Sequence, residues 1–189
     1  MKNFDSATLV SQLQRSQAQL ESIRHEFHAN PELGFHETNT SSKVSKLLNE
    51  WGYDVVTGIG GTGIVASLTK GTGTKSIALR ADMDALPIHE ASGVKYQSAC
   101  SGKMHACGHD GRTSMLLGAA QWLASDSANF NGTVRLIFQP SEEDMRGAQA
   151  MIDDGLFTRF PVDAVYGMHN MPGYPQGHMA FKEGATMAA

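Results

Sequence analysis

Short apolar runs alternate with helical patterns from residue 77 onward, and this alternation limits the possible fold more than any other feature. The expected order is strand, helix, strand, helix, strand, over Ile77–Ala81, Gly111–Leu123, Thr133–Phe138, Ala148–Asp154 and Ala164–Met168. Strands separated by helices are typical of the α/β class, in which helices cover the faces of the sheet. The sequence therefore predicts an α/β fold with a mixed, mostly parallel sheet flanked by helices.

The first part of the chain adds two helices and further strands. Apolar residues recur at helical spacing over Ser6–Phe27 and Glu37–Trp51, which predicts one helix in each range. Short β-branched runs and Gly-rich turns fill Tyr53–Arg80, where we expect consecutive strands with hairpins at the glycine pairs. A phosphate-binding loop is the alternative for the glycines at 58–63, but no Gly-Lys-Ser/Thr and no helical pattern follow them, which favours a hairpin.

Composition narrows the functional classes. The 189 residues are 41% hydrophobic and 18% charged, which is typical of a globular protein with one domain, or one domain and part of another. A net charge of −4 argues against nucleic acid or an anionic membrane as a partner. The sequence contains no apolar stretch long enough to span a bilayer and no secretory signal pattern, so we expect a cytoplasmic protein.

Residues that can bind metal or transfer protons collect where the predicted strands end and where one predicted helix begins. They are Asp82, Asp84, Cys107, His109, Asp110, Glu142, Glu143 and His169. In open α/β sheets, ligands bind in the crevice beyond the carboxyl ends of the strands. We therefore expect these four loops to converge in space.

The residue types point to a metal site. Cys107 and His109 place a thiol and an imidazole together; this pair suits Zn, and added carboxylates extend the choice to Mn, Co or Ni. Two adjacent glutamates can divide the work, one as a ligand and the other as a proton acceptor. Taken alone, each piece has a more ordinary explanation: Cys107 as a small buried side chain, His169 or the Glu142–Glu143 pair as solvated surface. His105 is a candidate supporting residue beside the cluster.

Several longer runs resemble one enzyme family. They are RHEFHANPELGFHE, ALRADMDALPI, GKMHACGHDGRTSMLLGAA, IFQPSEE and GMHNMP. In this order they are similar to the metal-dependent amidohydrolases that include hippurate hydrolases, N-acyl-amino-acid amidohydrolases and indole-acetyl-amino-acid hydrolases. The resemblance implies a catalytic domain of the zinc-exopeptidase type, two divalent metal ions (Zn, Mn, Co or Ni), and hydrolysis of the amide bond of small N-acyl amino acids.

The resemblance also assigns roles. It implies that the metal ligands are Cys107, His109, Glu143 and His169. Glu142 corresponds to the general base and acid, and Asp84 to the aspartate that orients a metal-site imidazole. Asp82 stands where related peptidases have a ligand histidine and is, with His105 and Asp110, a candidate for supporting the ligands.

The sequence departs from the family pattern in three ways. Arg112 replaces the histidine of a common GHDGH motif, and Ser141 and Asp144 replace a small residue and a glycine beside the glutamate pair. By resemblance, residues 1–189 form the N-terminal part of the catalytic domain, without the lid and dimerisation domain and without one further ligand histidine. We therefore expect a fragment with little or no activity, from a parent enzyme that forms a homodimer. A dipeptidase or aminopeptidase of the same superfamily, and a non-catalytic metal-binding remnant, are the alternatives.

Overall fold

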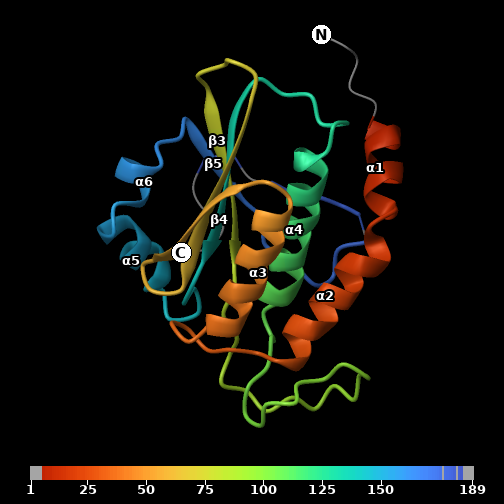
Figure 1. The fold of residues 1–189 in the computed structure, drawn as a ribbon. Helices are drawn as coiled ribbons and strands as arrows, with labels where there is room; N and C mark the ends of the chain where they lie inside the picture. Colours follow the sequence, from red (N-terminus) through yellow and green to blue (C-terminus); the bar gives the residue numbers. More distant parts are fainter. Residues whose placement is uncertain (1–5, 176, 182, 185–189) are drawn as a thin grey trace.

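A five-stranded sheet with helices on both faces forms the centre of the computed structural model, which describes residues 6–175, 177–181 and 183–184. The helices are α1 (Ser6–Gln14), α2 (Gln17–Ala29), α3 (Thr38–Glu50), α4 (His109–Ala124), α5 (Gly147–Asp153) and α6 (Leu156–Arg159). The strands are β1 (Asp54–Ile59), β2 (Gly63–Lys70), β3 (Ser76–Asp82), β4 (Gly132–Gln139) and β5 (Ala164–Gly167). Helices α1 to α4 lie on one side of the sheet and α5 and α6 on the other (Figure 1). The predicted α/β class and mixed sheet are confirmed.

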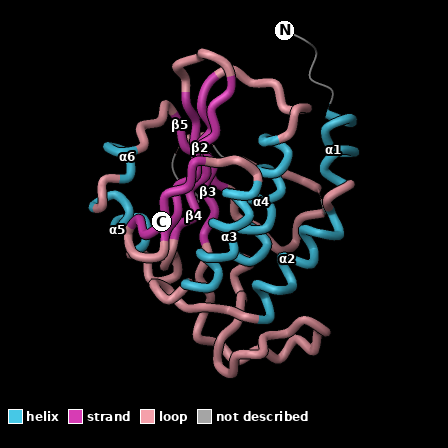
Figure 2. Tube along the Cα trace, viewed as in Figure 1, coloured by secondary structure: helices cyan, strands magenta, loops and turns pink. Residues whose placement is uncertain are grey.

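The strand order is β1-β2-β4-β3-β5. Strand β2 pairs antiparallel with β1 and β4, whereas β3 pairs parallel with β4 and β5. Strands β3, β4 and β5 therefore end at the same edge of the sheet. The long loop from β3 to α4 also lies at this edge (Figure 2).

Successive side chains of the central strands point to opposite faces of the sheet, and this separates two hydrophobic cores. In β4, Leu136 and Phe138 pack with α3 and α4, while Ile137 between them packs with Met151 and Leu156 on the opposite face. A side-chain period of two requires this division whenever both faces of a strand are covered. Both cores hold β4 in place, so the loop that follows it starts from a fixed point.

Two expectations about the first part of the chain were wrong in detail. The single helix predicted over Ser6–Phe27 is interrupted, because the amide groups of Arg15 and Ser16 bond back to Gln12 and Leu13 at 3.2 and 3.0 Å and close α1 there. No large apolar side chain lies between Leu13 and Leu20 to hold a continuous helix against the core. The break divides the range into α1 and α2.

The glycine pairs form only one of the expected hairpins. Strands β1 and β2 are joined through Gly60 and Gly61, both at positive φ, as predicted. Strands β2 and β3 do not pair, because β4 lies between them. The turn after β2 folds over Asn131, whose Oδ1 accepts hydrogen bonds from the amides of Thr72 (2.8 Å) and Gly73 (2.6 Å). Asn131 immediately precedes β4, so this contact places the start of β4 beside the end of β2, where β3 would lie in a hairpin.

Within the described residues, no helix is both long enough and apolar enough to cross a membrane. The short helix α6 was not predicted from the sequence.

Candidate metal centre

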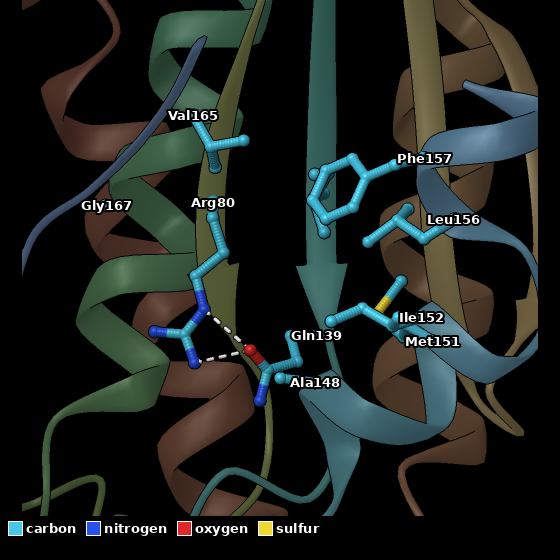
Figure 3. Close-up of a pocket in the computed structure, with 10 residues that line it drawn as sticks. Arg80, Gln139, Ala148, Met151, Ile152, Leu156, Phe157, Val165 and Gly167 are labelled. Atoms are coloured by element: carbon cyan, nitrogen blue, oxygen red, sulfur yellow. Dashed lines mark hydrogen bonds between the residues drawn. The ribbon is translucent and has the colours of Figure 1, made fainter. Parts of the chain in front are cut away.

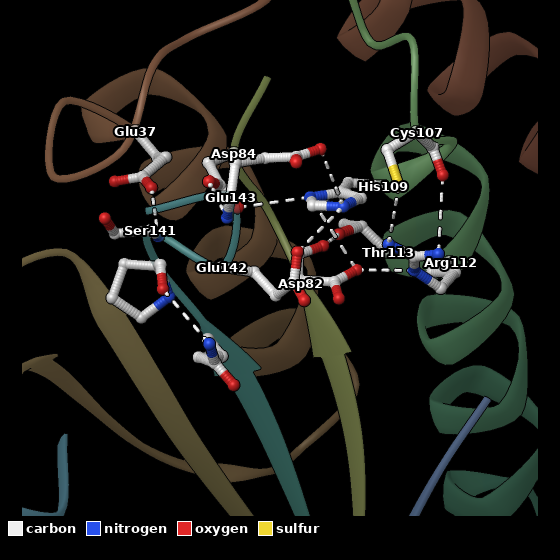
Figure 4. Close-up of polar contacts among 12 residues, drawn as sticks. Glu37, Asp82, Asp84, Cys107, His109, Arg112, Thr113, Ser141, Glu142 and Glu143 are labelled. Carbon is white, nitrogen blue, oxygen red and sulfur yellow. Dashed lines mark hydrogen bonds and ion pairs between the residues drawn. The ribbon is translucent and has the colours of Figure 1, made fainter. Parts of the chain in front are cut away.

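The carboxyl ends of β3, β4 and β5 bring the predicted residues together. Asp82, the last residue of β3, pairs with Gln139, the last residue of β4, in parallel register. Glu142 and Glu143 follow β4, and His169 follows β5. His109 opens α4 and projects toward the glutamates (Figure 4). The four loops therefore converge as expected from the sequence.

His109 lies at the centre of this group and is almost completely buried. Its Nδ1 lies 3.1 Å from Asp84 Oδ1, and its Nε2 lies 3.5 Å from Glu143 Oε1 and 3.6 Å from Glu142 Oε2. A ring that donates Nδ1–H to a carboxylate presents the lone pair of Nε2 on its other side. His109 Nε2 and Glu143 Oε1 are buried and have no hydrogen-bond partner among the described residues. Facing lone pairs of this kind are the environment that a cation requires.

Cys107 and His169 form a second contact beside His109. Cys107 Sγ lies 3.4 Å from His169 Nε2, although 62 residues separate them. The ligand atoms of Cys107, His109 and Glu143 lie within 4.8 Å of one another, as do those of Asp82, His109 and Glu142. Ligands about 2.0–2.3 Å from a tetrahedral ion are about 3.3–3.8 Å apart. The His109–Glu143 and Cys107–His169 distances fit that spacing, so these residues fit a divalent ion.

Asp84 connects His109 to the loop after β4 that carries Glu142 and Glu143, called here the glutamate loop. Its Oδ1 faces His109, while its Oδ2 accepts a hydrogen bond of 3.0 Å from the amide of Glu143. Burial alone would raise the pKa of Asp84, but hydrogen bonds from His109 and from the amides of Glu142 and Glu143 outweigh it and lower the pKa. Asp84 therefore stays ionised and fixes the orientation of the imidazole.

Two of the candidate ligands are held closer to their protonated forms. Burial, together with the carboxylates of Glu142 and Asp84, raises the pKa of Glu143 against the opposing effect of His109. Burial also raises the pKa of the Cys107 thiol, although Arg112 acts in the opposite direction. A bound cation would reverse both effects, because it favours carboxylate and thiolate.

Asp82 and Arg112 form a buried ion pair next to these residues. Arg112 Nε donates to Asp82 Oδ1 at 2.6 Å, and Arg80 donates to Asp82 Oδ2 at 2.7 Å. The guanidinium of Arg112 also donates to Asn170 Oδ1 at 2.9 Å. Asp82 Oδ1 lies 3.8 Å from His109 Nδ1, at the edge of the cluster. Arg112, read from the sequence only as a departure from a motif, thus joins the ends of β3 and β5.

Asp110 does not face the cluster, although it follows His109. Its Oδ2 accepts from Arg24 Nε at 3.1 Å and lies 2.9 Å from His28 Nδ1. His28 in turn contacts Glu90 in the long β3–α4 loop, with 3.1 Å between Nε2 and Oε1. Asp110 therefore fixes the start of α4 to α2 and to this loop. Sequence spacing gave no sign of a role for His28, because its partners lie 62 and 82 residues away.

His105 is buried on the same loop, and neither ring nitrogen has a hydrogen-bond partner among the described residues. Burial lowers its pKa to about 4. His105 therefore stays neutral at physiological pH and makes none of the contacts seen at His109.

One cavity among the described residues lies away from these side chains. It has a volume of about 250 Å³ and lies between the sheet and helices α5 and α6, with Met151, Leu156 and Phe157 in its wall (Figure 3). Arg80 and Gln139 close the end nearest Asp82 through hydrogen bonds of 2.9 and 2.7 Å. Its wall is almost entirely apolar and offers no group for proton transfer.

Comparison with known proteins is decisive about ancestry. The model of "Peptidase family M20/M25/M40" matches residues 78–184, which contain every candidate residue described so far in the cluster. The chain belongs to this family. The hippurate hydrolase of Campylobacter jejuni is 50% identical over 96% of this chain and 47% of the length of that protein. The N-acetyl-L-cysteine deacetylase of Bacillus subtilis is 43% identical over 90% of this chain and 41% of its own length.

Solved structures give the same assignment. A putative aminohydrolase from methicillin-resistant Staphylococcus aureus has a TM-score of 0.82 at 38% identity, covering 88% of this chain and 44% of that one. The Bacillus subtilis YXEP protein, described as a dinuclear metal-binding peptidase of the M20 family, has a TM-score of 0.80 at 37% identity, covering 86% and 45%. This M20 chain spans about half the length of the curated relatives that it matches.

Proposed function

We propose that this chain carries the metal-binding and proton-transfer groups of an enzyme that hydrolyses the amide bond of N-acyl amino acids. The observation that carries the proposal is the position of His109 Nε2, which has no hydrogen-bond partner within the described part of the chain and faces Glu142 and Glu143 at 3.6 and 3.5 Å. The 50% identity to a hippurate hydrolase supports the substrate class, a small molecule in which an acyl group is joined to an amino acid.

The proposed ligands are Cys107, His109, Glu143 and His169, for two divalent ions together with groups beyond these residues. Such ions would supply Lewis acidity toward the amide carbonyl and lower the pKa of water. Their identity among Zn, Mn, Co and Ni stays open, since thiolate, imidazole and carboxylate accept each of them. Asp84 orients His109, and Asp82 with Arg112 supports the β3 end of the site.

Glu142 is the proposed catalytic base and acid. Its side chain is 35% exposed, so the carboxylate reaches solvent while lying beside His109. In the reaction, Glu142 accepts a proton from the water whose oxygen attacks the carbonyl carbon. As the C–N bond breaks, the same carboxyl gives that proton to the leaving nitrogen, which yields a carboxylic acid and a free amino acid.

A second candidate is peptide cleavage. The "Thermostable carboxypeptidase 2" of Saccharolobus solfataricus is 44% identical over 88% of this chain and 42% of its own length. A C-terminal peptide bond is also the amide of an N-acylated amino acid, so the same side chains suit it. A dipeptidase or aminopeptidase would in addition need a group that recognises a free amine.

We further propose that residues 1–189 correspond to the N-terminal part of a catalytic domain, that the parent enzyme forms a homodimer, and that it works in the cytoplasm. Analytical ultracentrifugation and cell fractionation test the last two.

The experiment uses the purified protein, expressed with whatever sequence flanks these residues in its gene. Metal content is measured by elemental mass spectrometry, and glycine release from hippurate by chromatography. We expect Glu142→Gln to lower the rate by about 10²–10⁴-fold with metal content unchanged, and Glu143→Gln to lower the metal content. Metal binding without hydrolysis of hippurate, N-acetyl amino acids or dipeptides by the wild type would instead identify a non-catalytic remnant.

A further inference from the structure

Glu37 lies between α2 and α3, and its side chain reaches the loop that carries Glu142 and Glu143. The side chain of Glu37 is completely buried. Its Oε1 accepts a hydrogen bond of 2.8 Å from the amide of Ser141, and its Oε2 accepts one from the hydroxyl of Thr62. Figure 4 shows Glu37 next to Ser141, on the side of the cluster opposite Cys107. The two side-chain hydrogen bonds of Glu37 go to Ser141 and Thr62 and not to a candidate metal ligand. Its contact with the loop that carries Glu142 and Glu143 is therefore made through Ser141, and its charge also acts on the carboxylate of Asp84.

Ser141 has a backbone conformation that non-glycine residues rarely adopt, with φ of 47°. Met145, four residues later, also has a positive φ, of 58°. The loop between them is closed by bonds from the amide of Gly147 to Ser141 O (3.0 Å) and from the amide of Met145 to Glu142 O (2.7 Å). Left-handed backbone at such residues persists only where surrounding contacts impose it.

The contacts around Ser141 come from the segment that contains Glu37. Ser141 is completely buried, and a Cβ on Gly34 would lie 2.6 Å from Ser141 Oγ, so the two segments touch with no space between them. The hydrogen bond from the Ser141 amide to Glu37 fixes the backbone of Ser141, which is the residue immediately before Glu142. A change of a few tens of degrees in the torsions there would move both glutamates away from His109.

Glu32, on the same segment, provides the contrast. Its carboxylate accepts bonds from the amides of Asn39 (3.1 Å) and Thr40 (2.8 Å), at the start of α3. Both glutamates therefore bind backbone amides, but Glu32 stabilises a helix and Glu37 holds the glutamate loop.

We propose that Glu37 is a positioning residue, which holds Ser141 so that Glu142 and Glu143 face His109. This inference rests on the proposed function, because it assumes that the two glutamates serve a metal-dependent reaction. It adds a residue that lies outside the matched region of the family model and more than 100 positions from the loop it controls.

The test compares Glu37→Ala, Glu37→Gln and the control Glu32→Ala, using two readouts. The first is the rate of trypsin cleavage after Arg146, an exposed residue of the same loop, in protein without metal. The second is Zn²⁺ affinity, measured by competition with a chromophoric chelator. We expect Glu37→Ala to speed cleavage at least fivefold and to weaken Zn²⁺ binding at least tenfold. Glu37→Gln should restore both to within threefold, because the amide oxygen still accepts from Ser141 and the amide nitrogen can donate to Thr62.

Other results would overturn the inference. They are wild-type Zn²⁺ affinity in Glu37→Ala, or an equal loss of affinity in Glu32→Ala, which would mark a general loss of stability. If Glu37→Ala does not fold, Gly34→Ala presses on the side chain of Ser141 while Glu37 remains, because the added Cβ would lie 2.6 Å from Ser141 Oγ. This variant must then weaken Zn²⁺ binding at least threefold. A wild-type protein that binds no Zn²⁺ overturns the proposed function as well, and this outcome is recognised without any variant.

Discussion

Arg112 Nε lies 2.6 Å from Asp82 Oδ1, and both side chains are almost completely buried, with 2% and 1% of their surface exposed. Removing one partner of such a pair leaves the other charge buried without compensation. Arg80 also contacts Asp82, at 2.7 Å, and reduces this cost. The stability of the fold therefore depends on this ion pair, which lies at the end of β3, where the candidate ligands gather.

We expect Arg112→Met to lower the free energy of unfolding by about 2–4 kcal/mol. Urea unfolding followed by circular dichroism measures the change. Arg146→Met is the matched control, because Arg146 pairs with Asp144 at 2.6 Å but its side chain is 66% exposed. That variant should stay within about 0.5 kcal/mol of the wild type. Equal losses in the two variants would contradict a special role for the buried pair.

Cys107→Ser should weaken Zn²⁺ binding at least tenfold and Mn²⁺ binding less, because a thiolate favours the softer ion. The measurement is chelator competition with each metal. Cys100→Ser is the control, since Cys100 is also a free, partly buried cysteine but belongs to neither group of potential ligands. Identical affinities in the two variants would remove Cys107 from the proposed ligand set.

Gly147→Ala should lower the free energy of unfolding by about 3 kcal/mol or more, because a Cβ there would lie 1.6 Å from the carbonyl oxygen of Pro140. Backbone atoms can move aside only by distorting the loop that carries Glu142. Gly102→Ala is the control: it has φ of 75° and no atom within 4 Å of the added Cβ, so only the backbone conformation is strained, by about 1 kcal/mol. Thermal unfolding measures the difference. Equal midpoint temperatures for Gly147→Ala and Gly102→Ala would contradict this steric explanation.

We expect the buried carboxylate of Glu90 to make a contribution to stability that is lost in acid. Burial alone would raise its pKa, but hydrogen bonds from Ser92, the amide of Ser98 and His28 lower it from 4.5 to about 2. A carboxyl whose pKa is lower in the folded state stabilises the fold above the unfolded value. That contribution is lost as the pH falls from about 4.5 to about 2.

Replacing Glu90 with Gln should therefore flatten the decrease in unfolding free energy over this pH range. Urea unfolding at several pH values tests the expectation, and Glu50→Gln, a change at an exposed side chain, should keep the wild-type slope. An unchanged slope in Glu90→Gln would mean that other carboxyls cause the acid sensitivity.

The elements that the sequence predicted well are those with strong local patterns. Strands β3 and β4 and helix α4 carry apolar runs, and α3 has helical spacing, so their predicted positions agree with the structure to within a few residues. Convergence of the loops at the carboxyl edge also followed from the α/β pattern, because parallel strands end together.

The rest depends on contacts between distant residues. Nothing local to Glu37 distinguishes it from Glu32, and its function in the fold appears only with Ser141, 104 residues away. The contacts of Arg112 with Asn170 and of His28 with Glu90 have the same origin. The Arg15–Ser16 break and the place of β4 in the sheet are also decided by packing rather than by propensity.

The place of β4 between β2 and β3 has a consequence for synthesis of the protein. A ribosome releases β2 and β3 before β4, and neither can pair with the other in the final sheet. Until residue 139 has emerged, the nascent chain carries two apolar strands with unpaired edges, which are templates for association with other chains. Slow translation around residues 83–131 would prolong that exposure, and a chaperone that covers extended apolar segments would act in this interval.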